Sequence, residues 1–403
     1  MSSSDILRFL RDPRDFACDS IDADLWSAGL TRIARPRAES TGRPLRKAQI
    51  EAWEGLAHAR VGLILGPPGT GKTHALAWMA AAYLEARRAE GLPCRIYVTA
   101  FTRNAIVNLL EAIAQRGALL PEKSRVVFAG RSPVDQLGHG VEGVDAGDLE
   151  SLLDSDYIVV GATVWGLNKV LGARGVATED IFHLVCIDEA SQMVLSHGLM
   201  ALAGLEKSGR VVVAGDNKQL PPIREEYEHR IDGRRLGSSL YTFLQAANVP
   251  EYPLDETFRL NEPLTRYPRT RFYEERYRSA TPDRRLTLIS DWENGLEDWE
   301  RVALDPEYPI CVLVHDGPPS GTSNAFEAAI VARLSDALLK RLPPPASGNR
   351  DDLWEHGLAV ISPHRAQNAL IRRLLAQTPH GEKPIVETVD RIQGRERDAI
   401  LVS

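Results

Sequence analysis

Short apolar runs alternate along the chain with segments whose apolar residues recur at helical spacing. In the first half, the apolar runs predict five buried strands, at Val61–Leu65, Arg95–Thr99, Tyr157–Val160, Leu184–Ile187 and Val211–Ala214. Helical faces follow the first two, made by Leu76, Met79, Ala80, Tyr83 and Leu84 and then by Ile106, Leu109, Leu110 and Ile113. Strands buried on both faces that alternate with helices form a parallel sheet covered on both sides, so this half predicts an α/β unit.

A second set of apolar runs predicts strands at Ile310–Val314, Leu358–Ser362, Ile385–Val389 and Ala399–Val402. A helix between them carries Leu370, Ile371, Leu374 and Leu375 on one face. The predicted fold class is therefore α/β, with two parallel-sheet domains in tandem that cover residues 41–250 and 251–403 and join near residues 246–262. Residues 1–40 fit neither sheet and stay unassigned, since Pro13 interrupts their one weak helical pattern.

Composition changes this picture little. The chain has 403 residues, 43% of them hydrophobic and 26% charged, which is ordinary for a globular protein. It lacks the ~18–20-residue apolar run of a membrane helix, and its N-terminus lacks a signal-peptide pattern. A cytoplasmic location without a membrane partner is the default expectation. The four cysteines form no Cys-x-x-Cys pair, which disfavours a metal site. Cys94 and Cys186 lie in or beside apolar runs, which favours buried free thiols at these two positions.

The strongest chemical signal is a phosphate-binding loop. Residues 66–73 read Gly-Pro-Pro-Gly-Thr-Gly-Lys-Thr, directly after a predicted strand and before a predicted helix. Gly66, Pro67, Pro68, Gly69, Thr70 and Gly71 shape the loop. Its backbone N–H groups point at phosphate oxygens, while Lys72 reaches the β and γ phosphates and Thr73 ligates Mg²⁺. The pattern predicts a site for ATP and Mg²⁺.

Two carboxylates end the strand at Leu184–Ile187. Asp188 suits Mg²⁺, together with Thr73, and Glu189 suits the deprotonation of a water that attacks the γ phosphate. On its own, such a pair is more often a solvated strand end; a phosphate-binding loop in the same chain favours the catalytic interpretation.

Gln219 and Arg259 are two further candidates. Gln219 follows the strand Val211–Ala214 and is placed to sense the γ phosphate at the carboxyl edge of the sheet. A proline-terminated turn is the alternative interpretation. Arg259 lies at the junction of the two predicted domains, where an arginine stabilises the phosphoryl-transfer transition state; the alternative is a surface residue.

Taken together, these motifs resemble superfamily 1 helicases. DEASQ at residues 188–192, GDNKQLPP at 215–222 and Phe258-Arg259 follow the phosphate-binding loop in the order of that family, most like the superfamily 1B branch of the nonsense-mediated-decay helicase and the replication nuclease-helicase. The resemblance implies two RecA-like domains. It also implies that Gln49 reads adenine, Phe258 stacks on it, Arg259 contacts the γ phosphate and Glu396 holds the ribose.

The same resemblance implies contacts with the backbone of single-stranded DNA or RNA. The matching residues are Thr102, Asn104 and Thr163 in the first domain and His364, Arg365 and Thr388 in the second. Short polar residues at strand ends are as often helix caps. Net charge is −7, so a nucleic-acid site is expected to be a local groove rather than a basic surface.

One further segment, residues 266–278, interleaves arginines with aromatic residues and resembles the Phe-Tyr-Glu-Gly segment of the family. It predicts either a packed, solvated helix or a surface that stacks on bases.

The sequence departs from the family pattern toward its C-terminus. The second arginine-finger motif, motif VI, does not follow residues 388–396, so we expect the second domain to be incomplete at its C-terminus. The expected protein partners are therefore a missing C-terminal part of the motor or a fused or partner nuclease.

Three functions stay open at this point. The leading one is an ATP-driven 5′→3′ translocase or helicase on single-stranded nucleic acid, with the polarity implied by the resemblance alone. The second is an ATP-gated module that binds nucleic acid or a partner with little unwinding. The third is a small-molecule kinase or unrelated switch, which the carboxylate pair and the second α/β unit disfavour.

Overall fold

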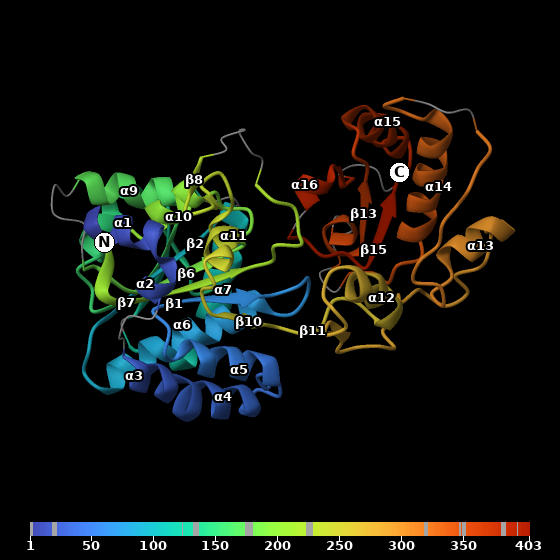
Figure 1. Ribbon diagram of the computed structural model, residues 1–403. Coiled ribbons are helices and arrows are strands. Elements are labelled where there is room, and N and C mark those ends of the chain that lie inside the picture. The colour runs from blue at the N-terminus through green and yellow to red at the C-terminus, as the bar shows by residue number, and fades with distance from the viewer. Residues whose placement is uncertain are drawn as a thin grey trace. The chain divides into compact units, whose positions relative to one another are not determined.

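The computed structural model describes residues 3–17, 22–122, 124–131, 137–173, 180–222, 229–317, 321–345, 348, 352–379, 384–392 and 394–403. Its contacts divide the chain into two compact units (Figure 1). Unit 1 comprises Met1–Phe258 and Arg271–Arg278, and unit 2 comprises Arg259–Thr270 and Ser279–Ser403. The chain thus enters unit 2 after Phe258, returns to unit 1 at Arg271 and leaves it again after Arg278.

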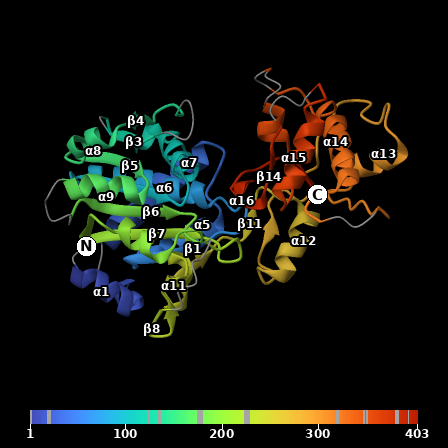
Figure 2. The same ribbon diagram turned by 90° about the horizontal axis from the view of Figure 1, so that it is seen from above.

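Unit 1 is built on an eight-stranded sheet in the order β10-β1-β7-β6-β2-β5-β3-β4. Figure 2 shows β1, β7, β6, β5, β3 and β4 in this succession across the sheet. Its neighbouring strands run parallel. The strands are β1 (Val61–Leu65), β2 (Cys94–Ala100), β3 (Arg125–Ala129), β4 (Glu142–Val144), β5 (Tyr157–Ala162), β6 (Phe182–Asp188), β7 (Leu205–Gly215) and β10 (Glu251–Pro253). The five strands expected in this half are confirmed, while β3, β4 and β10 were not expected.

Successive strand residues of unit 1 point into two different cores, as the alternation of a pleated strand requires. In β2, Ile96 and Val98 belong to one core and Tyr97 to the other. The first core lies under α3 (Ala23–Ala28), η1 (Gly29–Ala34), α4 (Arg35–Ser40), α5 (Lys47–Leu56), α6 (Lys72–Ala89) and α7 (Arg103–Ala114). The second lies under α1 (Ser3–Arg11), α2 (Pro13–Ala17), α8 (Ala146–Leu152), α9 (Val164–Ala173), α10 (Leu195–Ala201) and α11 (Leu240–Ala246).

The N-terminal segment, which sequence reasoning left unassigned, belongs to both cores of unit 1. Phe9 and Phe16 pack into one, and Trp26 into the other, each at most 1% exposed. Trp26 and Trp53 donate their indole N–H groups to each other's backbone carbonyls, at 2.8 and 3.2 Å. Pro13 begins α2, where a missing backbone N–H costs nothing.

Arg210 ties this segment to the sheet. Its buried guanidinium donates to four backbone carbonyls, those of Asp22, Leu56, Ala57 and Ala59. The guanidinium also lies over the Trp26 ring, 4.4 Å from its centroid. Burial lowers the pKa of Arg210 to about 10, so the group stays charged at neutral pH.

Replacing Arg210 with methionine is expected to lower the free energy of unfolding by at least about 3 kcal/mol, because each buried carbonyl left without a donor costs ~1–3 kcal/mol. Chemical denaturation followed by circular dichroism measures the change. The matched control is Arg32→Met, at an exposed position in η1, which should stay within ~0.5 kcal/mol of the parent chain. Equal losses in the two variants would contradict this role of Arg210.

Unit 2 holds a three-stranded sheet in the order β14-β13-β15, also parallel. Its elements are α12 (Glu262–Arg271), α13 (Asp298–Leu304), α14 (Ala325–Leu339), η3 (Leu353–Gly357), β13 (Leu358–Ile361), α15 (Arg365–Leu375), β14 (Val386–Glu387), α16 (Val389–Ile392) and β15 (Ala399–Val402). Leu358 and Val360 of β13 join one apolar core with α14 and α15, and Ala359 and Ile361 face Ile392 of α16. The predicted α/β class with two parallel sheets is confirmed.

One predicted strand of unit 2 is wrong. Residues 310–314 form no strand, and the side chains of Ile310, Val312 and Val314 are 59, 78 and 88% exposed. Their β-branched composition is typical of strands, but a strand also needs a partner's backbone groups and a packed face. The expected strand at Ile385–Val389 is shorter than predicted, because helix α16 begins at Val389.

None of the helices in the described residues combines the length and hydropathy that a bilayer crossing requires. Cys94 and Cys186 are buried free thiols, as expected, and Cys311 is exposed, while Cys18 lies outside the described residues. Burial raises the pKa of Cys94 to about 12, so its thiol stays neutral and packs as a small apolar group.

Candidate nucleotide site

The phosphate-binding loop, residues 66–73, connects the carboxyl end of β1 to the first residue of α6. A Cβ atom at Gly66 would lie 1.9 Å from Cγ of Lys72, so only glycine lets the lysine fold over the start of the loop. Gly71 caps α6 in the left-handed region, at φ 79°, which favours glycine. The loop therefore presents the N-terminus of a long helix, where backbone N–H groups and the helix dipole favour an anion.

Lys72, Thr73 and Asp188 converge at this loop. Lys72 Nζ donates to the carbonyl of Gly66 at 2.6 Å. Thr73 Oγ1 donates to Asp188 Oδ2 at 2.7 Å, which joins the start of α6 to the carboxyl end of β6. Thr70 Oγ1 closes the loop on itself through the carbonyl of Pro67, at 2.8 Å. A hydroxyl and a carboxylate at hydrogen-bond distance beside a lysine suit a phosphate together with its cation.

The donor set fits Mg²⁺ rather than a metal bound by protein alone. Thr73 and Asp188 offer oxygen atoms, and Asp188 is only 2% exposed. Among the residues that the structure describes, no group of three or more His, Cys, Asp or Glu side chains is placed to hold a metal ion. Mg²⁺ is usually held by one or two protein oxygens, with substrate phosphates and water as its other ligands.

Glu189 occupies an unusual backbone position. Its φ is 50°, in the left-handed region that non-glycine residues rarely adopt, and its N–H donates to Asp188 Oδ1 at 2.8 Å. Gln192 Nε2 lies 3.5 Å from Glu189 Oε2. Such strain, about 1–3 kcal/mol, concentrates at functional sites. The turn sets Asp188 and Glu189 at the carboxyl edge of the sheet beside the phosphate-binding loop.

Gln49 and Phe258 line one shallow pocket beside the loop. Its lining comprises Arg46, Ala48, Gln49, Thr70, Leu254, Asp255, Glu256 and Phe258. Gln49 Oε1 accepts from Arg46 N at 3.1 Å, and Gln49 Nε2 is 3.5 Å from the carbonyl of Thr70. Phe258 N donates to the carbonyl of Gly69 at 2.9 Å, and the Arg46 guanidinium lies over the Phe258 ring, 5.1 Å from its centroid. The lining thus brings together Gln49 and Phe258, the two residues that the resemblance assigns to adenine, with the Arg46 guanidinium over the Phe258 ring.

Gln219 reaches a buried carboxylate that sequence reasoning did not single out. Asp216, at 0% exposure, accepts from Gln219 Nε2 at 2.9 Å and from the backbone N of Lys218 at 3.0 Å. It directly follows β7, which pairs with β1, so Gln219 lies at the same edge of the sheet as the phosphate-binding loop. An aspartate at a strand end beside Gln219 was the available signal.

Residues 266–278 follow neither of the two expected descriptions throughout. Helix α12 ends at Arg271, and Tyr267, 63% exposed, lies on it. Beyond it Phe272 is also exposed, but two tyrosines turn inward: Tyr273 Oη donates to Asp216 Oδ2, and Tyr277 Oη donates to the carbonyl of Pro68, both at 2.6 Å. Burial, aided by the negative charge of Asp216, raises the pKa of Tyr273, so its hydroxyl stays protonated and donates.

Arg259 and Glu396, two of the nucleotide residues expected from the second domain, pair with each other in unit 2. Arg259 Nε donates to Glu396 Oε1 at 2.7 Å, and Nη2 contacts the same oxygen. The ion pair thus joins the first residue of unit 2 to a residue near its C-terminal end, 137 residues away in sequence.

The nucleic-acid candidates of unit 1 lie at the carboxyl ends of neighbouring strands. Thr102 and Thr163 follow β2 and β5, and Thr102 and Asn104 are exposed. Both threonines cap helices: Thr102 Oγ1 accepts from Ala105 N at 3.2 Å, and Thr163 Oγ1 from Gly166 N at 3.1 Å. A capping hydroxyl still carries its own hydrogen, so both groups keep a donor for a phosphate oxygen.

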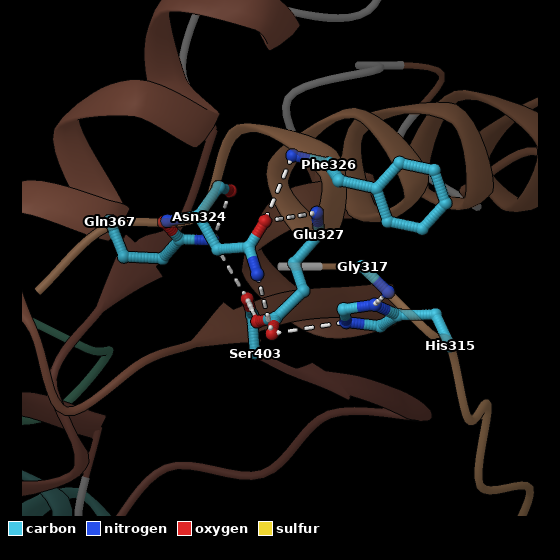
Figure 3. A network of polar contacts seen from close by, with 7 residues as sticks. All are labelled: His315, Gly317, Asn324, Phe326, Glu327, Gln367 and Ser403. Atoms are coloured by element: carbon cyan, nitrogen blue, oxygen red, sulfur yellow. Dashed lines mark hydrogen bonds and ion pairs between the residues drawn. The ribbon is translucent and has the colours of Figure 1, made fainter. Parts of the chain in front are cut away.

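The candidates of unit 2 share an edge of its sheet. His364 and Arg365 are exposed at the start of α15 after β13, and Thr388 follows β14, which pairs with β13. Beside them, a polar network joins α14, α15 and the end of β15 (Figure 3). Ser403 Oγ donates to Glu327 Oε2 at 3.0 Å and accepts from Gln367 Nε2 at 2.9 Å. Through Gln367, this network links the first turn of α15, where His364 and Arg365 lie, to Ser403 at the end of β15.

Comparison with known proteins bears on this arrangement. Two family models, both described as AAA domain, match residues 49–225 and 236–403. The DNA replication ATP-dependent helicase/nuclease DNA2 of Mus musculus is 28% identical over 365 residues, covering 85% of this chain and 32% of that protein. The regulator of nonsense transcripts 1 homolog of Arabidopsis thaliana is 28% identical over 403 residues, covering 89% of this chain and 30% of that protein.

Among solved structures, the DUF1998 helicase MrfA bound to DNA matches with a TM-score of 0.43 and 10% identity, over 90% of this chain and 40% of that one. The chain spans about a third of the length of the curated relatives it matches. The two AAA domains follow each other in the order of the sequence motifs, and the matched relatives come from both branches that those motifs resemble. The two AAA domain matches and the similarity to both relatives support the assignment of this chain to the superfamily 1 helicases.

Proposed function

We propose that this chain is the ATP-driven motor of a 5′→3′ translocase or helicase on single-stranded nucleic acid. The contact between Thr73 Oγ1 and Asp188 Oδ2, at 2.7 Å, carries the nucleotide part of the proposal. It joins the phosphate-binding loop to the carboxylate strand within one parallel sheet. Support for the motor comes from the second α/β unit and from relatives named as ATP-dependent helicases.

In the proposed reaction, Lys72 binds the β and γ phosphates, and Thr73 and Asp188 hold Mg²⁺. When bound, Mg²⁺ neutralises charge that develops on the phosphate oxygens. Glu189 takes the proton of the attacking water, and Gln219 senses the γ phosphate. Gln49 and Phe258 hold the adenine.

Arg259 and Glu396 act from the second domain in this proposal. They leave each other when ATP binds, Arg259 for the γ phosphate and Glu396 for the ribose. Through this exchange of partners, the arrangement of the two domains depends on whether a γ phosphate is bound, as in other nucleotide switches. The strand then moves because the two domains bind its phosphates in turn. The contacts come from Thr102, Asn104 and Thr163 in the first domain and from His364, Arg365 and Thr388 in the second. Phosphate contacts hold the strand without reading its sequence.

The motor is tested by the ATPase rate of the full chain with and without single-stranded oligonucleotides of deoxythymidine or uridine. We expect at least one of them to raise the rate severalfold, and the better one identifies DNA or RNA. Streptavidin placed on the 3′ or the 5′ end tests polarity, since a 5′→3′ translocase displaces it from the 3′ end only. Equal rates with and without either strand would contradict a motor.

The paired state of Arg259 and Glu396 favours one alternative, an ATP-gated module that binds a strand or a partner with negligible turnover. In such a module the pair stays closed, and ATP changes only affinity. The two functions differ in a filter-binding assay combined with an ATPase assay: a gated module shows ATP-dependent retention of the oligonucleotide without phosphate release.

A further inference from the structure

Residues Arg271–Arg278, here called the strap, belong to unit 1 although the chain on both sides of them belongs to unit 2. The chain comes from residues 259–270 of unit 2, passes through the strap and continues into residues 279–403 of unit 2. The strap is therefore a piece of unit 1 that is covalently attached to unit 2 at both ends.

One end of the strap reaches the group that orients Gln219. Tyr273 Oη and Gln219 Nε2 both donate to Asp216 Oδ2, at 2.6 and 2.9 Å. Asp216 Oδ1 is taken by the backbone N of Lys218, at 3.0 Å. Because Asp216 is fully buried, its carboxylate needs these donors to offset the loss of water. Tyr273 and Gln219 donate to the same oxygen, so the Tyr273 hydroxyl helps to position the Gln219 carboxamide.

The other end of the strap reaches the phosphate-binding loop. Tyr277, 1% exposed, donates to the carbonyl of Pro68 at 2.6 Å, and Thr257 Oγ1 donates to the same carbonyl at 2.9 Å. The rings of Tyr273 and Tyr277 are 5.1 Å apart. Glu274 and Glu275 between them have φ values of 49° and 61°, a tight turn in the left-handed region. The turn lets one short segment hold both Asp216 and Pro68.

We infer that Tyr273 and Tyr277 are positioning residues of the nucleotide site, and that the strap couples strand binding in unit 2 to Gln219 and the phosphate-binding loop. The inference rests on the proposed motor function. A displacement of unit 2 acts on the strap from both ends, and the two hydroxyl groups transmit it to Asp216 and Pro68. Neither tyrosine is assigned a contact with ATP, so their effect falls on turnover rather than on ATP affinity.

The test is steady-state ATPase kinetics with saturating oligonucleotide. It compares Tyr273→Phe and the double variant, in which phenylalanine replaces both Tyr273 and Tyr277, with the parent chain. The matched control is Tyr308→Phe, at an exposed tyrosine of unit 2. For Tyr273→Phe we expect kcat to fall about tenfold, as for the loss of one hydrogen bond to a charged group. KM for ATP should stay within about twofold, because no substrate contact is lost. The double variant should also lose most of its stimulation by the strand.

A second variant separates positioning from damage to the strap. Glu275→Gly relieves a left-handed backbone position and keeps both hydroxyl groups, so its kcat should match that of the parent chain. Thermal unfolding verifies that all variants fold. Parental kcat in Tyr273→Phe, a rise in KM alone, or an equal loss in Glu275→Gly would overturn the inference.

Hydrogen exchange distinguishes failure of the strap from failure of the motor. Measured on the chain without nucleotide or strand, amide exchange at residues 216–219 should be faster in Tyr273→Phe than in Tyr308→Phe. If the parent chain shows no strand-stimulated ATPase, the motor proposal fails, and equal exchange in the two variants overturns the strap independently.

Discussion

The Glu189→Gln variant is expected to lose ATP hydrolysis while it still binds ATP. The carboxamide has nearly the shape of the carboxylate but cannot take a proton from the attacking water, and general-base catalysis contributes about 10²–10⁴-fold. No phosphate contact is lost, so affinity should change little. Phosphate release under single-turnover conditions measures the chemical step, and titration with a fluorescent ATP analogue measures binding.

Two other variants sharpen this result. Glu54→Gln, at an exposed position of α5, should behave like the parent chain in both assays. Lys72→Ala should weaken binding itself, because it removes a cation that contacts the phosphates. Hydrolysis at the parental rate by Glu189→Gln would show that the proton acceptor is another group, and would leave the left-handed backbone at Glu189 without a catalytic explanation.

Replacing Arg259 with alanine is expected to have the other large effect. An arginine that stabilises the transition-state charge of phosphoryl transfer is worth about 10³–10⁵ in rate. We therefore expect strand-stimulated kcat to fall by at least ~10³-fold with a smaller change in KM, since the contact strengthens in the transition state. Steady-state kinetics with saturating oligonucleotide checks the prediction.

A variant of Glu396, the ion-pair partner of Arg259, separates a role at the phosphates from a role in the ion pair. Glu396→Gln breaks the same ion pair but, as a proposed ribose ligand, should raise KM far more than it lowers kcat. Arg301→Ala removes an exposed arginine of α13 that pairs with nearby Asp298, at 3.4 Å, and should be neutral. Equal kinetic effects of Arg259→Ala and Glu396→Gln would mean that the ion pair is structural and that Arg259 has no separate role at the phosphates.

Features that depend on local sequence were predictable. The strand, the glycines and the lysine of the phosphate-binding loop are contiguous, so one short motif specifies strand β1, the left-handed Gly71 and the start of α6. The carboxylate pair at 188–189 follows a continuous apolar run, which predicts a buried strand with its carboxyl end at the same edge of a parallel sheet. The contact between Thr73 and Asp188 then follows from topology alone.

Features that depend on distant partners were not predictable. Tyr273 and Asp216 are 57 residues apart in sequence, and nothing local to either indicates the other. Arg210 finds its carbonyl partners more than 150 residues away, at Asp22 in the segment left unassigned from sequence and at the end of α5. The run at 310–314 shows the converse, because strand propensity without a described partner strand leaves its side chains in solvent.

The central claim is that ATP bound at the phosphate-binding loop draws Arg259 away from Glu396 to the γ phosphate. An experimental structure of the chain with ADP–aluminium fluoride and a single-stranded oligonucleotide tests it most directly. We predict the Arg259 guanidinium within ~2.7–3.2 Å of a fluoride that marks the γ position, and Glu396 at the ribose. An Arg259 still paired with Glu396 and remote from the bound nucleotide would contradict the account.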